Sequence, residues 1–221
     1  MNVYRRVLDT TTKLLRDNVD VKNRAVVFDL DDTIINTNLR SEFNVPMVGM
    51  VEFYDRIPEM VELVKRVKAM GYIVIIITAR PPGTEYIAIQ NLKEKVPEIL
   101  PMIDMVFASP IPLSGDIERF RQFKAVLRRN LEQIDLKSAK QMNSWQLYTL
   151  ELYKQFKKED RINIVLTIGD QPHDIGLMSN YGILLPRRER DPHHAYLYQR
   201  SYLKSKNPNP NQIHEVCLQK I

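Results

Sequence analysis

The sequence predicts an α/β fold in which a doubly wound parallel sheet carries helices on both faces. Short apolar runs rich in β-branched residues recur along the chain, at about 24–29, 72–77, 103–108, 162–168 and 182–186. Within the first two, Ala25 to Phe28 and Tyr72 to Ile77 are apolar throughout, which is typical of strands buried on both faces. Segments with helical periodicity alternate with the first strands, and this rhythm favours right-handed βαβ units.

The spacing of apolar and breaker residues predicts helices between these strands. Residues 3–15 carry apolar side chains at roughly helical spacing and predict a first amphipathic helix. Pro58 and Gly71 mark the ends of another helix, and a third is expected from about 84 to 96. Residues 34–57 lack clear periodicity and predict a loop long enough to lean over a site.

The second half of the chain predicts two further helices and a basic extension. Residues 117–134 place apolar side chains along one helical face with five basic residues around it. This pattern favours a surface helix, and a lid or anion-attracting flank is the alternative. A second helix is expected from Trp145 to Phe156. The chain from Arg187 is basic and finally rich in Pro and Asn, so we expect a loosely held extension with disorder from about Lys204.

The composition is that of a globular protein with one domain. Of its 221 residues, 44% are hydrophobic and 27% charged, which is ordinary for such a chain. We expect one domain over 1–221, with a core at about 20–186, a small lid insert at 109–137 and a basic extension at 187–221. With Cys217 as the only cysteine, and with neither a secretory signal pattern nor a membrane-spanning apolar run, we expect a cytoplasmic protein without a membrane partner.

The charge balance is mildly basic. The chain has 32 Lys and Arg against 27 Asp and Glu, giving a net charge of +5. The two signs are interspersed, so polyanionic partners are only weakly favoured. Basic residues at 119–129 and 187–190 make nucleic acid an alternative partner, although a solvated surface explains them better.

Polar side chains follow three of the predicted strands. They are Asp29, Asp31 and Thr33 after the first strand, Thr78 after the second, and Asp170 and Asp174 after the fourth. Because parallel strands place their carboxyl ends at one edge, we expect these residues to converge. Crowded carboxylates repel one another unless a cation compensates them, and Mg²⁺ prefers oxygen ligands. Taken alone, the residues after the first strand are also compatible with an acidic surface turn.

Such a site can transfer a phosphoryl group through a covalent intermediate. A carboxylate beside bound Mg²⁺ can attack the phosphorus of a phosphate ester, while the metal neutralises charge on the transferring oxygens. A hydroxyl and a lysine would complete the cage around those oxygens. A second carboxyl group must protonate the leaving group and later deprotonate water, and Asp31 is placed for that role.

Together these motifs resemble those of the haloacid dehalogenase superfamily of phosphotransferases. Its DxDxT motif is matched by Asp29, Asp31 and Thr33, its second motif by Thr78, and its acidic fourth motif by Gly169, Asp170 and Asp174. The motifs cover the chain from about 24 to 186. FDLDDT, the TxR of Thr78 to Arg80, IGDQxxD and the closing LLP resemble the acid phosphatase branch, which includes plant vegetative storage proteins.

The resemblance implies a Rossmann-like sheet with a small helical insert and no large cap, and it assigns roles to individual residues. It implies Asp29 as nucleophile and Asp31 as general acid and base. The implied Mg²⁺ ligands are Asp29, Asp170 and the backbone carbonyl of Asp31, with Asp174 and Thr33 behind them or acting through water. The implied phosphate ligands are Thr78, Ala79 and a lysine. We expect this lysine to be Lys137 or Lys140, with Lys124 as a poorer third candidate.

The predicted function is therefore a magnesium-dependent phosphomonoester hydrolase acting on a phosphorylated small molecule or nucleotide. Only 49 positions separate Asp29 from Thr78 (78 − 29), so no large cap fits between them. A phosphatase of polynucleotide 3′ or 5′ ends, and a catalytically idle binding or storage protein, are the alternatives. The intact set of acidic residues favours an enzyme.

Overall fold

The computed structural model of the protein describes most of the chain. The described residues are 2–18, 20, 22–37, 55–111, 117–150, 161–176, 180–186, 191–201 and 214–221. Most of the expected loop at 34–57 lies outside them, as does the second half of the helix expected from Trp145 to Phe156. The described parts of this segment, 34–37 and 55–57, contain two short strands. β2 (Ile35–Asn36) pairs antiparallel with β3 (Asp55–Arg56).

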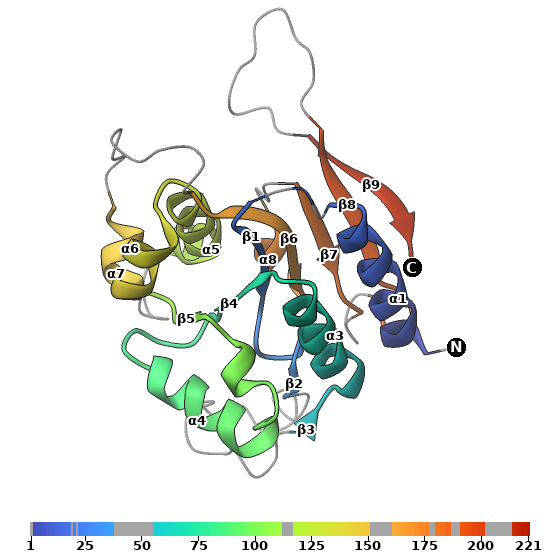
Figure 1. The fold of residues 1–221 in the computed structure, drawn as a ribbon, viewed down its shortest axis with the longest axis horizontal. Helices are drawn as coiled ribbons and strands as arrows, with labels where there is room; N and C mark the ends of the chain where they lie inside the picture. Colours follow the sequence, from blue (N-terminus) through green and yellow to red (C-terminus); the bar gives the residue numbers. More distant parts are fainter. Residues whose placement is uncertain are drawn as a thin grey trace, which may run out of the picture.

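A seven-stranded sheet forms the centre of the described chain (Figure 1). Its order is β5-β4-β1-β6-β7-β8-β9, and the first five strands in that order run parallel. The strands are β1 (Arg24–Phe28), β4 (Ile73–Ile77), β5 (Met105–Phe107), β6 (Asn163–Gly169), β7 (Tyr181–Leu184), β8 (Tyr196–Ser201) and β9 (His214–Lys220). The α/β class and the five predicted strands are thus confirmed.

Helices flank this sheet, as the predicted alternation requires. They are α1 (Val3–Arg16), α3 (Pro58–Ala69), α4 (Glu85–Lys95), the 3₁₀ turn η2 (Leu100–Met102), α5 (Ile117–Leu131), α6 (Leu136–Gln141), α7 (Ser144–Tyr148) and α8 (Pro172–Ile175). The Asn2 side chain caps α1 by accepting from the Tyr4 N–H at 2.8 Å. Pro58 begins α3, where a missing N–H costs nothing.

Two apolar clusters form on the two faces of the sheet because side chains alternate along each strand. On β1, Val26 and Phe28 join the cluster that also contains apolar residues of α1, α3 and α4. Ala25 and Val27 join the second cluster, to which α5, α6 and α7 contribute. This double burial explains why β1 is apolar at each position from Ala25 to Phe28. No helix among the described residues is long and apolar enough to cross a lipid bilayer.

The prediction of a loosely held C-terminal extension was wrong for 196–201 and 214–221. β8 pairs antiparallel with β7, and β9 pairs antiparallel with β8. Ala195, Leu197 and Ile221 are buried in the same cluster as α1. The pairing satisfies backbone groups that β7 would otherwise expose at the edge of the sheet.

The prediction of a lid at 109–137 was also wrong where that segment is described. Phe123, Leu127 and Leu131 of α5 are fully buried against the sheet, so α5 belongs to the core. Residues 112–116 lie outside the described chain. The helix expected from Trp145 begins at Ser144 as α7 but ends at Tyr148, and α6 before it was not predicted.

Candidate active site

The polar residues predicted to converge lie at the carboxyl edge of three adjacent strands. β1 lies between β4 and β6, and Phe28 is in register with Ile76 and Ile168. Chain order reverses at β1, since the sequence continues to β4 on one side and later returns to β6 on the other. Such a switch point is where ligands bind in open α/β sheets.

The turn after β1 determines how its acidic residues are presented. Ile34 N–H donates to Leu30 O at 2.9 Å, which turns the chain back on itself. Asp32 adopts a left-handed backbone conformation with φ 57°, which Asp tolerates better than most residues. Its carboxylate accepts from Thr37 N–H at 2.6 Å. The Asp32 carboxylate is therefore hydrogen-bonded within the turn, while the side chains of Asp29 and Asp31 are directed at the site.

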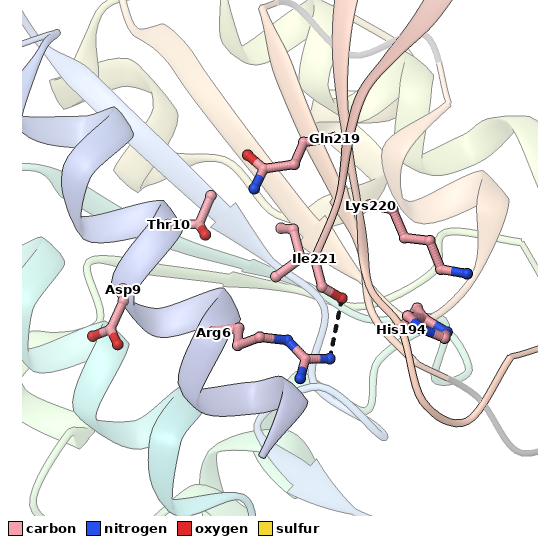
Figure 2. A pocket seen from close by; sticks show the side chains of 7 residues that line it. All are labelled: Arg6, Asp9, Thr10, His194, Gln219, Lys220 and Ile221. Carbon is pink, nitrogen blue, oxygen red and sulfur yellow. Dashed lines mark hydrogen bonds between the residues drawn. The ribbon is translucent and has the colours of Figure 1, made fainter. Parts of the chain in front are cut away.

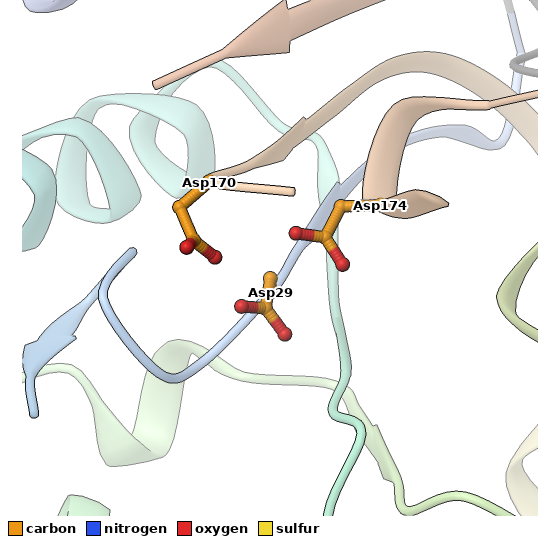
Figure 3. A group of neighbouring side chains, drawn as sticks. All are labelled: Asp29, Asp170 and Asp174. Atoms are coloured by element: carbon orange, nitrogen blue, oxygen red, sulfur yellow. The ribbon is translucent and has the colours of Figure 1, made fainter. Parts of the chain in front are cut away.

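Three carboxylates gather at this edge (Figure 3). Asp29 follows β1, Asp170 follows β6, and Asp174 lies in α8. One oxygen from each lies within 4.8 Å of the others, and all three residues are buried. Thr33 Oγ1 is 3.5 Å from Asp29 Oδ2, at the limit of a hydrogen bond.

Lys124 of α5 reaches into this acidic cluster. Its Nζ lies 2.6 Å from Asp29 Oδ1 and 2.5 Å from Asp174 Oδ1, and its side chain is 2% exposed. Burial alone would lower the pKa of Lys124, but the charges of Asp174 and Asp29 outweigh burial and raise it. The Lys124 ammonium therefore forms ion pairs with both carboxylates.

The expectation that Lys137 or Lys140 completes the site was wrong. Both are exposed residues of α6. Lys140 Nζ lies 3.5 Å from Asp104 Oδ1, and Asp104 also accepts from Val74 N–H at the start of β4. That location is the amino edge of the sheet, opposite the acidic cluster.

Asp174 is held by contacts that the sequence did not reveal. Its Oδ2 accepts from Gln171 N–H at 2.8 Å. The buried Arg128 donates from Nη1 to Asp174 O at 2.7 Å and from Nη2 to Gly176 O. Position 169 must be glycine here, because an added Cβ would lie 2.2 Å from Asp174 Cβ.

Asp31 occupies the β4 side of the site. Arg80 binds its carboxylate through two nitrogens, with Nη2 2.9 Å from Oδ1 and Nε 3.1 Å from Oδ2. Thr78 Oγ1 lies 3.3 Å from Asp31 Oδ2. Ala79, between these two residues, is half-buried. Thr78 therefore meets Asp31 as expected, whereas the burial of Arg80 against Asp31 was not anticipated.

Burial and neighbouring charges shift the pKa values of titratable groups at this edge. Burial, followed by the negative charge of Asp174, raises the pKa of Asp29 well above its ordinary value, although Lys124 acts in the opposite direction. Burial and the charges of Asp32 and Asp170 likewise raise the pKa of Tyr4 to about 12. Three carboxylates face one lysine, so a divalent cation would offset the remaining negative charge. The carboxylate oxygens of Asp29, Asp170 and Asp174 are donors of the kind that hard cations such as Mg²⁺ take.

A separate surface pocket of about 530 Å³ lies between α1 and the C-terminal strands (Figure 2). Its lining consists of Arg6, Asp9, Thr10, His194, Gln219, Lys220 and Ile221. It shares no residue with the acidic cluster, and Arg6 Nη2 donates to Ile221 O at 3.4 Å across it.

Comparison of the chain with models of protein families and with curated proteins finds no match to either.

Proposed function

We propose that this protein is a magnesium-dependent phosphomonoester hydrolase of the haloacid dehalogenase type, acting through a phosphate ester on Asp29. One arrangement carries this proposal. The buried ammonium of Lys124 bridges Asp29 and Asp174 beside Asp170, at the switch point of a parallel sheet. A nucleophilic carboxylate with a fixed cation next to it is suited to attack on a phosphate ester.

The proposed chemistry uses two carboxyl groups, those of Asp29 and Asp31. An Asp29 oxygen attacks phosphorus, and the bond from phosphorus to the ester oxygen breaks. Asp31 donates a proton to the departing oxygen and then takes one from water. That water attacks phosphorus, the bond to Asp29 breaks, and inorganic phosphate leaves.

The remaining groups stabilise charge on the phosphoryl oxygens. Lys124 also favours the ionised, nucleophilic form of Asp29, and the Thr78 hydroxyl can donate to a phosphate oxygen. When bound at Asp29, Asp170 and the Asp31 carbonyl, Mg²⁺ would neutralise charge that develops as the phosphoryl group transfers. Because the chain leaves no room for a large cap between Asp29 and Thr78, the site would be open and would accept substrates as large as nucleotides. We therefore propose phosphorylated small molecules or nucleotides as substrates.

The proposal is tested with the full chain and p-nitrophenyl phosphate, in Mg²⁺ and in EDTA. We expect turnover with Mg²⁺, loss in EDTA, and loss in Asp29→Asn. Asp9→Asn, which alters an exposed carboxylate paired with Arg5, is the matched control and should retain activity. Acid-quenched protein should carry a hydroxylamine-labile phosphate on Asp29. Turnover that survives either EDTA or Asp29→Asn would exclude this mechanism.

A further inference from the structure

The four buried carboxylates of the site fall into two sets. Asp29, Asp170 and Asp174 approach within 4.8 Å of one another. Asp31 is also buried, at 6% exposed, but its carboxylate faces the guanidinium of Arg80. Asp29 and Asp31, two positions apart in the sequence, thus lie in two different environments. Asp29 belongs to a cluster suited to a cation, whereas Asp31 already faces a cationic side chain.

Arg80 is itself held in place from several directions. It is 3% exposed. Its Nη1 donates to Oδ1 of the buried Asn91 on α4, and its backbone N–H donates to Thr78 Oγ1 at 3.3 Å. Its carbonyl accepts from Ser109 N–H after β5 at 2.9 Å. An arginine stays charged at every relevant pH, so Asp31 faces a fixed, permanent cation.

We infer that Arg80 is a positioning residue that holds the Asp31 carboxyl group on the β4 side of the site, withheld from the cation cluster of Asp29, Asp170 and Asp174. This inference rests on the proposed phosphatase function and deepens it. Two parallel N–H to oxygen bonds determine both the position and the orientation of a carboxylate. Arg80 thereby keeps the Asp31 carboxyl group in a position to exchange a proton with the leaving group of the substrate.

Proton transfer needs this geometry, since a general acid must lie within hydrogen-bond reach of the atom that it protonates. A displacement of about 1 Å can cost on the order of 10²-fold in rate. An alkyl leaving group requires protonation as it departs, whereas p-nitrophenolate leaves readily without it. Loss of the Arg80 contact should therefore slow alkyl phosphates more than aryl phosphates, while general damage to the site would slow both equally.

The first experiment compares kcat/KM for ethyl phosphate and p-nitrophenyl phosphate. We expect Arg80→Met to lower the value for ethyl phosphate at least about 10-fold more than that for p-nitrophenyl phosphate, with Arg80→Lys in between. The double variant Arg80→Met/Asp31→Asn should lose no more on ethyl phosphate than Asp31→Asn alone, because both changes remove one function. Arg66→Met, which breaks an arginine pair with Glu62 on α3, is the matched control.

A second measurement is independent of turnover. Arg80→Met leaves the Asp31 charge uncompensated beside the cluster, so calorimetric titration of the metal-free protein with Mg²⁺ should show binding several-fold tighter than in the wild type. Adding Asp31→Asn should return the affinity to the wild-type value. An unpaired buried carboxylate can destabilise the fold. Arg80→Lys and the double variant retain charge balance, so the comparison of ethyl and p-nitrophenyl phosphate with these variants decides the question if Arg80→Met does not fold.

Equal losses on the two substrates, additive losses in the double variant, or unchanged Mg²⁺ affinity in Arg80→Met would each overturn the role of Arg80. These outcomes leave the phosphatase proposal standing, provided that wild-type turnover requires Mg²⁺ and Asp29. Wild-type turnover in EDTA would instead reject the phosphatase mechanism itself.

Discussion

Lys124 and Arg128 lie four residues apart on α5 and both reach Asp174. Lys124 Nζ contacts Asp174 Oδ1 at 2.5 Å, and Arg128 Nη1 donates to Asp174 O at 2.7 Å. Residues at this spacing share one face of a helix. One face of α5 thus brings two cations to the same residue, one to its side chain and one to its backbone.

Lys124→Met should reduce the rate of aryl phosphate hydrolysis by about 10²–10³-fold, the usual effect of removing one group that stabilises charge in the transition state. The measurement is kcat/KM under saturating Mg²⁺. Lys137→Met and Lys140→Met are the matched controls and should stay within about 2-fold of the wild type, since surface substitutions of this kind rarely disturb a fold. A loss in either control comparable to that in Lys124→Met would contradict the assignment of the lysine.

Arg128→Met should lower the free energy of unfolding by about 2–3 kcal/mol, because it removes charged donors to the buried carbonyl of Asp174 and the partly buried carbonyl of Gly176. Denaturation by urea in EDTA, followed by circular dichroism, measures this change. Arg129→Met is the control on the same helix: Arg129 is exposed, and we expect an effect within about 0.5 kcal/mol. If the two variants unfold at the same urea concentration, Arg128 does not hold the Asp174 turn.

Strands β1, β4, β5, β6 and β7 were predictable because burial on both faces of the sheet leaves a mostly apolar run in the sequence. Asp29, Asp31, Thr78 and Asp170 were predictable as neighbours for a related reason: each follows such a run, and parallel strands end at one edge. The strands at 196–201 and 214–221 were not, since their pairing depends on the open edge of β7 rather than on their own pattern.

Lys124 was harder to predict because α6 and α7 intervene between α5 and β6. The distance along the sequence therefore does not say which lysine reaches the carboxyl edge. The position of Lys124 around the helix does indicate which lysine this is. Lys124 directly follows the buried Phe123 and lies four residues before the buried Arg128. Arg80 gives no comparable signal, since its burial depends on Asp31 and Asn91, which come from distant parts of the chain.

Asp104 should make stability depend on pH at the amino edge of the sheet. Burial would raise the pKa of Asp104, but hydrogen bonds from Lys68 Nζ and Val74 N–H outweigh burial and lower it from 3.8. A carboxyl group with a lowered folded-state pKa stabilises the fold above its unfolded-state pKa, and this contribution disappears as pH falls through the folded-state value. Asp104→Asn should therefore be less stable than the wild type at pH 6, with a difference that shrinks below about pH 4.

Urea denaturation of both proteins between pH 6 and pH 3 tests this relationship. Asp9→Asn serves as the control, because Asp9 belongs to an exposed pair with Arg5 and surface pairs contribute little. A stability difference for Asp104→Asn that stays constant across this range would show that the carboxylate charge is not responsible.

Mg²⁺ should stabilise the fold even without substrate, because the carboxylates of Asp29, Asp170 and Asp174 repel one another when no divalent cation is bound. Binding to the folded state alone raises the free energy of unfolding by about 2.7 kcal/mol at a ligand concentration of 100 Kd. Thermal unfolding with MgCl₂ should therefore give a Tm several degrees above that in NaCl of equal ionic strength. Asp170→Asn removes the negative charge of this carboxylate, although an amide oxygen remains, and should abolish most of this rise, whereas Asp9→Asn should retain it. An equal rise in Asp170→Asn would mean that Mg²⁺ binds elsewhere on the protein, because the remaining cluster would have lost one of the negative charges that attract the cation.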